Sequence, residues 1–146
     1  MPIAVESFMT CNPRCVDAAT PIGEAYRLMD NFSVRHLPVL LEGRIAGLLS
    51  QRDLLRLESQ ANIDRAHDPV SDAMSLDPYV VDPSTDVAQV VAEMANRKLG
   101  SALVIDNQRL IGIFTTTDAL QAFAALLRRG ASEERRDTFR AAGLIE

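Results

Sequence analysis

One short pattern occurs twice in the chain and combines a glycine, a hydroxyl group and a carboxylate. Residues 47–53 form the first copy and residues 112–118 the second. In each, the glycine is followed by two apolar residues, then a serine or threonine and, three positions later, an aspartate. The surrounding residues predict a strand that leads into a helix, where free N–H groups and the helix dipole favour bound anions. A carboxylate there can accept two hydrogen bonds from the vicinal diol of a ribose.

The same spacing also suits a helix start that binds nothing. Ser50 with Asp53, and Thr115 with Asp118, have the separation of a capping box, in which each side chain accepts a hydrogen bond from the other residue's backbone N–H. A single motif of this kind indicates a cap rather than a site. Its repetition in register, each time after a glycine, favours a binding role in addition to the cap.

A pair of basic residues precedes a predicted strand in the first half only. Arg35 and His36 could hold a phosphate, because arginine binds anions through a planar fork and histidine is cationic when protonated. The residues 65 positions later are neutral. The pair can also be interpreted as surface charge at a strand edge. If it belongs to a site, the chain has two unequal sites, and the one with Arg35 and His36 binds phosphate better.

These motifs belong to an internal repeat. A shift of 65 residues aligns the two halves without a gap, with thirteen identical pairs such as Met9 with Met74. Two copies predict a pseudo-symmetric pair with a groove between the halves, where ligands bind. We expect a first domain over residues 5–58, a linker over 59–69, a second domain over 70–128 and a charged tail over 129–146.

Periodicity predicts the same order of elements in both halves. The first half should have a helix that starts at Thr20-Pro21, a strand over 37–41, a turn at 42–43, a strand over 45–49 and a helix from Ser50 to about Glu58. The second should have a helix that starts at Thr85-Asp86, a strand over 102–105, a turn at 106–107, a strand over 110–114 and a helix over about 117–128. Extended lead-in segments at 15–16 and 79–81 could add a short strand to each sheet, and Ser132 could cap a last helix.

Size, charge and residue counts bound the function. The chain has 146 residues and a net charge of -5, which gives no concentrated basic surface for nucleic acid. Without a signal peptide or an apolar run of about 20 residues, we expect a soluble cytoplasmic protein with no membrane contact. Two cysteines and two histidines do not supply a metal site, although oxidation of Cys11 and Cys15 could gate a cleft. No nucleophile arrangement or P-loop indicates an enzyme.

Together these residues resemble a tandem pair of cystathionine-β-synthase (CBS) domains, also called a Bateman module. The marks are Met9-Thr10 and Met74-Ser75, the helix start at Thr20-Pro21, the Leu37-Pro38-Val39 sequence and the repeated glycine-to-aspartate motif. The resemblance implies an α+β fold of two pseudo-symmetric β-α-β-β-α repeats that pack through their sheets with clefts between them. The second half departs from the pattern, with Ala102-Leu103 in place of the Leu-Pro pair.

The resemblance also implies two nucleotide sites, in which the aspartate holds the ribose hydroxyls and basic residues hold phosphate. The main site would combine Thr20, Val34, Arg35, His36, Leu37 and Pro38 with Thr115, Thr117 and Asp118. The second, weaker site would combine Ser50, Arg52 and Asp53 with Thr85, Leu99, Gly100 and Ser101.

As a function, the resemblance implies a stand-alone regulatory module, commonly a homodimer. It would bind AMP, ADP, ATP or S-adenosylmethionine as a regulatory ligand, use no cofactor, and modulate an unidentified partner protein. The alternative is a structural dimerisation module whose degenerate clefts stay empty.

Overall fold

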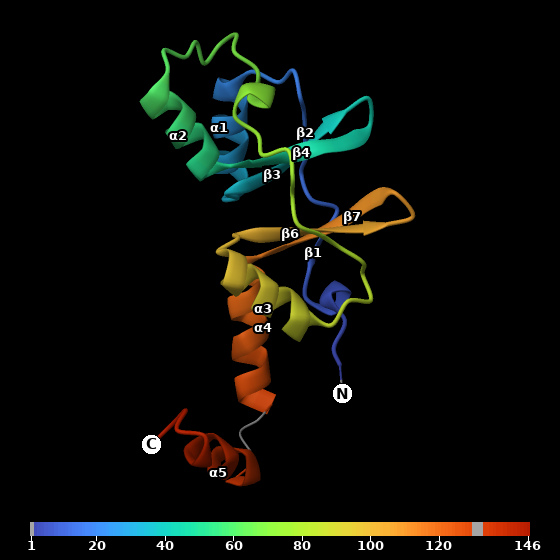
Figure 1. Cartoon of the computed structure of the whole chain (residues 1–146), viewed down its shortest axis with the longest axis vertical. Helices are drawn as coiled ribbons and strands as arrows, with labels where there is room; N and C mark the ends of the chain where they lie inside the picture. Colours follow the sequence, from blue (N-terminus) through green and yellow to red (C-terminus); the bar gives the residue numbers. More distant parts are fainter. Residues whose placement is uncertain (1, 130–132) are drawn as a thin grey trace.

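The computed structural model describes residues 2–129 and 133–146 and has the predicted α+β fold of two repeats (Figure 1). The elements of the first repeat are β1 (Thr10–Cys11), β2 (Val16–Asp17), α1 (Ile22–Phe32), β3 (His36–Leu41), β4 (Arg44–Ser50) and α2 (Gln51–Gln60). Those of the second are β5 (Val80–Val81), α3 (Val87–Arg97), β6 (Ser101–Asp106), β7 (Arg109–Thr115) and α4 (Thr116–Arg129), and α5 (Glu133–Ala141) follows. Single 3-10 turns at Val5–Ser7 and Val70–Asp72 precede the repeats.

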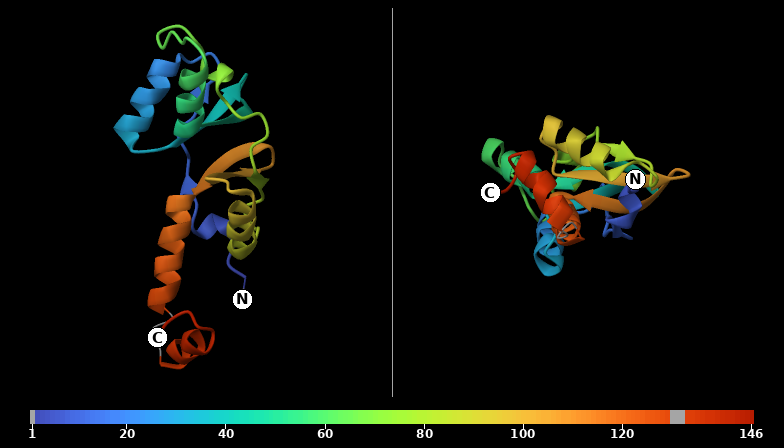
Figure 2. Two further views of the ribbon diagram at one scale, coloured as in Figure 1. Left: turned by 60° about the vertical axis from the view of Figure 1, so that its left-hand side comes forward. Right: turned by 90° about the horizontal axis from the view of Figure 1, so that it is seen from below.

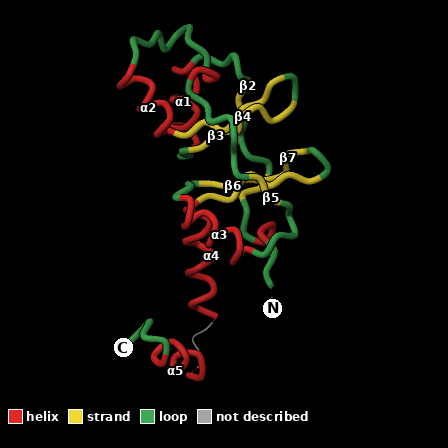
Figure 3. The backbone as a smooth tube through the Cα atoms, in the orientation of Figure 1, coloured by secondary structure: helices red, strands yellow, loops and turns green. Residues whose placement is uncertain are grey.

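Two mixed sheets form the middle of the molecule. One has the strand order β2-β3-β4 and the other β1-β7-β6-β5. In each sheet the short strand β2 or β5 runs parallel to the first hairpin strand, and the hairpin itself is antiparallel. Figure 3 shows the strands gathered centrally, with α1 and α2 on one side and α3 and α4 on the other. The repeats therefore meet through their sheets.

Both hairpins turn through two residues in the left-handed conformation. Glu42 and Gly43 have φ values of 52° and 78°, and Asn107 and Gln108 have 49° and 64°. Two positive φ values give the turn whose twist matches that of the strands. The turn predicted at 106–107 is wrong by one residue, because Asp106 is still paired in β6.

The helix starts differ in how they are capped. Ser50 caps α2 through a complete capping box, as predicted. The first helix starts later than predicted, because Pro21 is its N-cap and no side chain caps it, so Thr20 is not the cap. In α3 the cap is Asp86, whose side chain accepts a hydrogen bond from the backbone N–H of Ala88.

Each repeat receives the lead-in segment of the other. The N–H of Val5 donates to the carbonyl of Thr85 at 2.8 Å, and Val5 is fully buried in the core of the second repeat. In the same way the N–H of Val70 donates to the carbonyl of Thr20 at 2.8 Å, and Val70 is fully buried in the core of the first repeat. The hydrophobic core of each repeat is therefore completed by a distant part of the chain.

The exchange explains the glycine of each motif. A Cβ on Gly112 would overlap the thioether of Met9, and a Cβ on Gly47 would lie 3.0 Å from the sulfur of Met74. Each lead-in methionine therefore crosses the glycine of the opposite repeat, and any side chain there would displace it.

Helix α4 extends away from the body and carries α5 at its far end (Figure 2). Only Asp118 and Ala122 of α4 are buried. Four of its large apolar side chains are exposed: Leu120, Phe123, Leu126 and Leu127. The proposed cap at Ser132 lies outside the described residues. Within the part of the chain that the structure describes, no helix has both the length and the apolar character that crossing a lipid bilayer needs.

Candidate functional site

Asp118 lies in the first turn of α4 and is surrounded by hydroxyl groups. Its carboxylate accepts hydrogen bonds from the backbone N–H of Thr115 at 2.9 Å and from the hydroxyl of Thr115 at 3.1 Å. The hydroxyl of Thr10 donates to both carboxylate oxygens, at 3.1 and 3.3 Å. Asp118 is only 8% exposed. A buried carboxylate with hydroxyl donors on both oxygens has the chemistry needed to bind a ribose diol.

Sequence reasoning missed Thr10 as a site residue. It lies 108 positions from Asp118 and reaches it because β1 pairs antiparallel with β7, next to the motif of the second repeat. Thr10 stood in the family pattern as part of Met9-Thr10, and that was the signal that could have placed it in the site. No local pattern predicts which repeat a lead-in segment will join.

Asp53 occupies the equivalent position in α2 with fewer partners. Its carboxylate accepts from the backbone N–H of Ser50 at 2.9 Å, and its own N–H donates to the Ser50 hydroxyl at 3.0 Å. The counterpart of Thr10 is Ser75, which exchanges backbone hydrogen bonds with Leu48 at 2.8 and 3.0 Å. Among the described residues, the Ser75 side chain has no hydrogen bond to Asp53. At this end the motif is a capping box, with the carboxylate half-buried.

His36 and Gly100, assigned from sequence to different clefts, are neighbours. A Cβ on Gly100 would lie 2.7 Å from Nε2 of His36, so the imidazole packs directly against this glycine across the boundary between the repeats. Burial lowers the pKa of His36 below 6.5; the positive charges of Arg35 and Arg52 act in the same direction, and Asp53 opposes them. His36 is therefore predominantly neutral at pH 7, and its phosphate-binding charge would depend on a bound anion.

Arg35 lines a groove whose lining does not include His36. The groove has a volume of about 550 Å³ and is formed by the end of α1, the start of α2 and Arg65, together with Val34. The carbonyl of Arg35 accepts a hydrogen bond from the N–H of Gln51 at 2.9 Å. In the basic pair, His36 packs against Gly100 of the other repeat, whereas Arg35 lines the groove beside α2 and acts on His36 through its charge.

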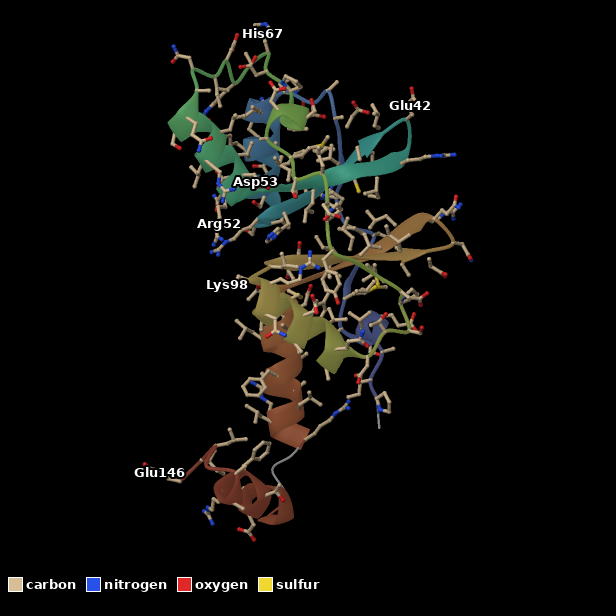
Figure 4. The ribbon with its side chains drawn as sticks, viewed as in Figure 1. Glu42, Arg52, Asp53, His67, Lys98 and Glu146 are labelled. Atoms are coloured by element: carbon tan, nitrogen blue, oxygen red, sulfur yellow. The ribbon has the colours of Figure 1, made fainter. Side chains whose placement is uncertain are left out.

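The remaining predicted site residues fall into two groups. Several serve the interior: Leu37 and Pro38 are fully buried, Leu99 packs on the second core, and Ser101 is 4% exposed with a hydroxyl that has no partner in the described structure. Thr20 and Thr85 anchor the exchanged lead-ins through their carbonyls. Arg52 and Thr117 are exposed. Figure 4 shows Arg52 and Asp53 of one repeat on the same side of the view as Lys98 of the other, next to the boundary between the repeats.

The cysteines and the possible metal ligands of the described residues do not form a common cluster. Among them, no three His, Cys, Asp or Glu side chains gather as metal ligands would. Cys11 is an exposed free thiol and Cys15 is a half-buried one. The predicted sites therefore depend on carboxylate, hydroxyl and imidazole groups.

Comparison with known proteins identifies the family to which the two repeats correspond. The family model of the CBS domain matches residues 5–59 and 70–125. The CBS domain-containing protein YhcV of Bacillus subtilis is 28% identical over 116 residues, which cover 79% of this chain and 81% of YhcV.

Two solved structures share the fold. One is a protein from Vibrio cholerae described as an acetoin utilization protein, AcuB, with a TM-score of 0.81 and 27% sequence identity. The match covers 91% of this chain and 99% of the AcuB chain. The other is CBSX2, solved in complex with AMP, with a TM-score of 0.74 and 27% sequence identity. The match covers 84% of this chain and 97% of the CBSX2 chain. Both likenesses extend through the two repeats.

Proposed function

Because this chain belongs to the CBS domain family, we propose that it is a regulatory module that binds an adenosine nucleotide between its repeats. AMP, ADP, ATP and S-adenosylmethionine are the candidate ligands, since all carry the same adenosine group. AMP is the ligand present in the related structure of CBSX2. The proposal includes no catalytic step and no cofactor, and it places the module in the cytoplasm, which contains these nucleotides.

The observation that carries the proposal is the pairing of Asp118 with Thr10 and Thr115. Three hydroxyl or amide donors already surround the carboxylate at 2.9 to 3.3 Å. The two Thr10 contacts are long for hydroxyl–carboxylate bonds, which are usually about 2.5–2.7 Å. We expect the ribose hydroxyls to replace the Thr10 contact with shorter bonds, while Thr115 keeps the carboxylate in place.

The same contact explains how binding would be sensed. Thr10 belongs to the lead-in of the first repeat, whereas Asp118 belongs to the second. A nucleotide that takes over Asp118 and also reaches His36 would change how the lead-in is held on the second repeat. A ligand shifts a conformational equilibrium only by its difference in affinity for the two states. This rearrangement supplies the difference that an unidentified partner protein would detect.

Titration calorimetry with the four candidate ligands tests the proposal. At least one should bind the wild-type chain, and Asp118→Asn should weaken that binding at least tenfold, because it removes charge-assisted bonds of about 1.5–3 kcal/mol. Asp53→Asn is the matched control, since it makes the same chemical change at the equivalent position. No binding of any of the four, or an equal loss in both variants, would contradict the proposal.

A structural dimerisation module is the second candidate, and the exposed apolar face of α4 favours it. Leu120, Phe123 and Leu127 recur at three- and four-residue spacing and are 64%, 59% and 41% exposed. Such a stripe on a protruding helix is typical of an interface. Sedimentation with and without AMP separates the two functions. A dimer that is unaffected by any nucleotide, in a chain that binds none, would favour the structural module.

A further inference from the structure

A cavity between the two hairpin turns is separate from both motif aspartates. It has a volume of about 440 Å³ and lies where the turns at 42–43 and 107–108 approach the lead-in at 12–15. Strands β4 and β7 start at these turns and end at the two capping boxes, seven residues away, which corresponds to roughly 20 Å. In Figure 4, Glu42 marks the turn end and Asp53 the motif end.

The lining of this cavity combines an apolar wall with a positive group. Leu40, Ile45 and Leu110 supply apolar surface. Gln108 and Arg109 supply an amide and a guanidinium, and no lining residue is acidic. Within the described residues, Arg109 forms no ion pair. Asp106 faces Arg109 across the β6–β7 hairpin, but it does not line the cavity. The cavity therefore offers a guanidinium that is held in no ion pair among the described residues, beside a hydrophobic surface.

The cavity does not follow the internal symmetry. Arg44 is the counterpart of Arg109 in the first repeat, yet only Arg109 is part of the lining. Gly43, which has no side chain, stands where the second repeat has Gln108. The two turns thus form one site between them rather than two equivalent ones.

We propose that this cavity binds a small organic carboxylate. The guanidinium of Arg109 would hold the carboxylate through paired hydrogen bonds, and the apolar wall would pack against the rest of the molecule. The volume lies in the usual range of small-molecule pockets, roughly 300–1,000 Å³. Because both repeats and one lead-in line the cavity, an occupant would couple them at the end opposite the nucleotide site. The inference does not depend on nucleotide binding.

Cys15 lines the same cavity and serves as an internal reporter. Iodoacetate and iodoacetamide both alkylate thiolates but differ in carrying a carboxylate or a neutral amide. The ratio of their rates at one cysteine is independent of how much of that thiol is ionised. Burial raises the pKa of the Cys15 thiol, so the ratio, rather than either rate, is the useful measurement.

Cys11 is the comparison within the same molecule. It is exposed and does not line the cavity. Trypsin cleaves after Arg14, so mass spectrometry reads the two cysteines on separate peptides. We expect the iodoacetate to iodoacetamide ratio to be several-fold higher at Cys15 than at Cys11. Equal ratios at the two cysteines would overturn the proposal.

Two arginine variants identify the responsible charge. Arg109→Gln should lower the ratio at Cys15 to that at Cys11, whereas Arg109→Lys should keep most of the difference. Arg44→Gln changes the net charge by the same amount and should have no effect. A similar loss in Arg44→Gln would show that the overall charge, and not the cavity, attracts the reagent. Asp118→Asn should leave the ratio unchanged, which separates this site from the nucleotide site.

A reversible ligand provides the second measurement. Benzoate has a carboxylate on an apolar body of suitable size, and benzamide is its neutral analogue. Benzoate in the millimolar range should slow the reaction of Cys15 with iodoacetamide and leave Cys11 unaffected, and benzamide should protect neither. Equal protection by both compounds, or by neither, would overturn the proposal even if an arginine variant proved to be unstable.

Discussion

Asp118 and Asp53 stand at equivalent positions of the two repeats, and both complete a capping box at the start of a helix. Only Asp118 also accepts a hydroxyl from the exchanged lead-in, through Thr10. Asp118 is 8% exposed, whereas Asp53 is half-buried. Both aspartates therefore cap a helix, but only Asp118 has additional contacts to a lead-in segment.

The difference has its origin in the lead-in segments. Thr10 and Cys11 pair with two residues of β7, so the lead-in continues the sheet and brings the Thr10 hydroxyl to Asp118. Ser75 forms a single isolated bridge with Leu48. A capping carboxylate thus becomes part of a larger site when a neighbouring strand is held firmly beside it. Sequence identity at the motif alone does not distinguish the two ends.

The largest effect on this comparison should come from the motif glycines. A Cβ on Gly47 would lie 2.5 Å from the backbone carbonyl of Ser75, whereas on Gly112 it would meet the flexible side chain of Met9. Gly47→Ala must therefore move backbone and should lower the free energy of unfolding by about 1–3 kcal/mol, as overpacking does. Gly112→Ala should cost less, since a methionine can change rotamer. Urea unfolding of both variants measures the difference; a larger loss in Gly112→Ala would contradict it.

The two aspartates should differ in what their removal does to nucleotide affinity. For the tightest of the candidate ligands, Asp118→Asn should raise the dissociation constant at least tenfold, and Asp53→Asn should change it by less than about threefold. Calorimetry at equal protein concentration gives both numbers. If Asp53→Asn had the larger effect, the second cleft would be the main site, and the contribution of Thr10 would be structural.

The lead-in hydroxyls offer a matched pair of smaller changes. Thr10→Val keeps the shape of the side chain and removes the hydroxyl, so the Asp118 carboxylate loses a donor; we expect the free energy of unfolding to fall by about 0.5–1.5 kcal/mol. Ser75→Ala removes a hydroxyl that has no bond to Asp53 and should be nearly neutral. Chemical denaturation measures both. Equal losses would show that the two ends are held alike.

The smallest effect should be on the pH dependence of stability. Burial lowers the pKa of His36 below 6.5, so the unfolded chain binds a proton there more readily than the folded protein. His36 should therefore destabilise the fold progressively as the pH falls below 6.5, and His36→Gln should flatten the decline. The control is His67, whose pKa is raised by its bond to Asp64. Its contribution is complete below pH 6.5 and is lost as the pH rises through the raised pKa, so His67→Gln should change the slope just above pH 6.5 rather than below it.

The sequence predicted the elements better than it predicted their partners. The strand-to-helix junction at Ser50 and the order of elements in both repeats follow from local spacing, and the structure has them. The second turn was predicted one residue too early because Asp106-Asn107 looks like a turn by composition, although alignment with 42–43 indicates 107–108. Residue types predict that a turn occurs near such positions, but the register of strand pairing determines which residues form it.

The contacts that build the site could not be predicted in the same way. The two-residue strand that contains Thr10 is too short for hydrophobic periodicity to identify. Periodicity also carries no information about a hydrogen-bond partner 108 positions away. The different neighbours of Arg35 and His36 likewise depend on tertiary packing. Local sequence patterns predict helices and strands from their periodicity, whereas the contacts within a site depend on tertiary packing.

The exchanged lead-ins also determine the order in which the protein can fold during its synthesis. Val5 leaves the ribosome before the second repeat is made, and the core that it joins there includes Phe114, which is made more than a hundred residues later. The core of the first repeat, in contrast, is complete once Val70 has been made. At about 5–20 residues per second, the segment around Val5 stays uncovered for several seconds or longer. A nascent chain of this protein therefore exposes an apolar segment that a chaperone can recognise until the last strand has been made.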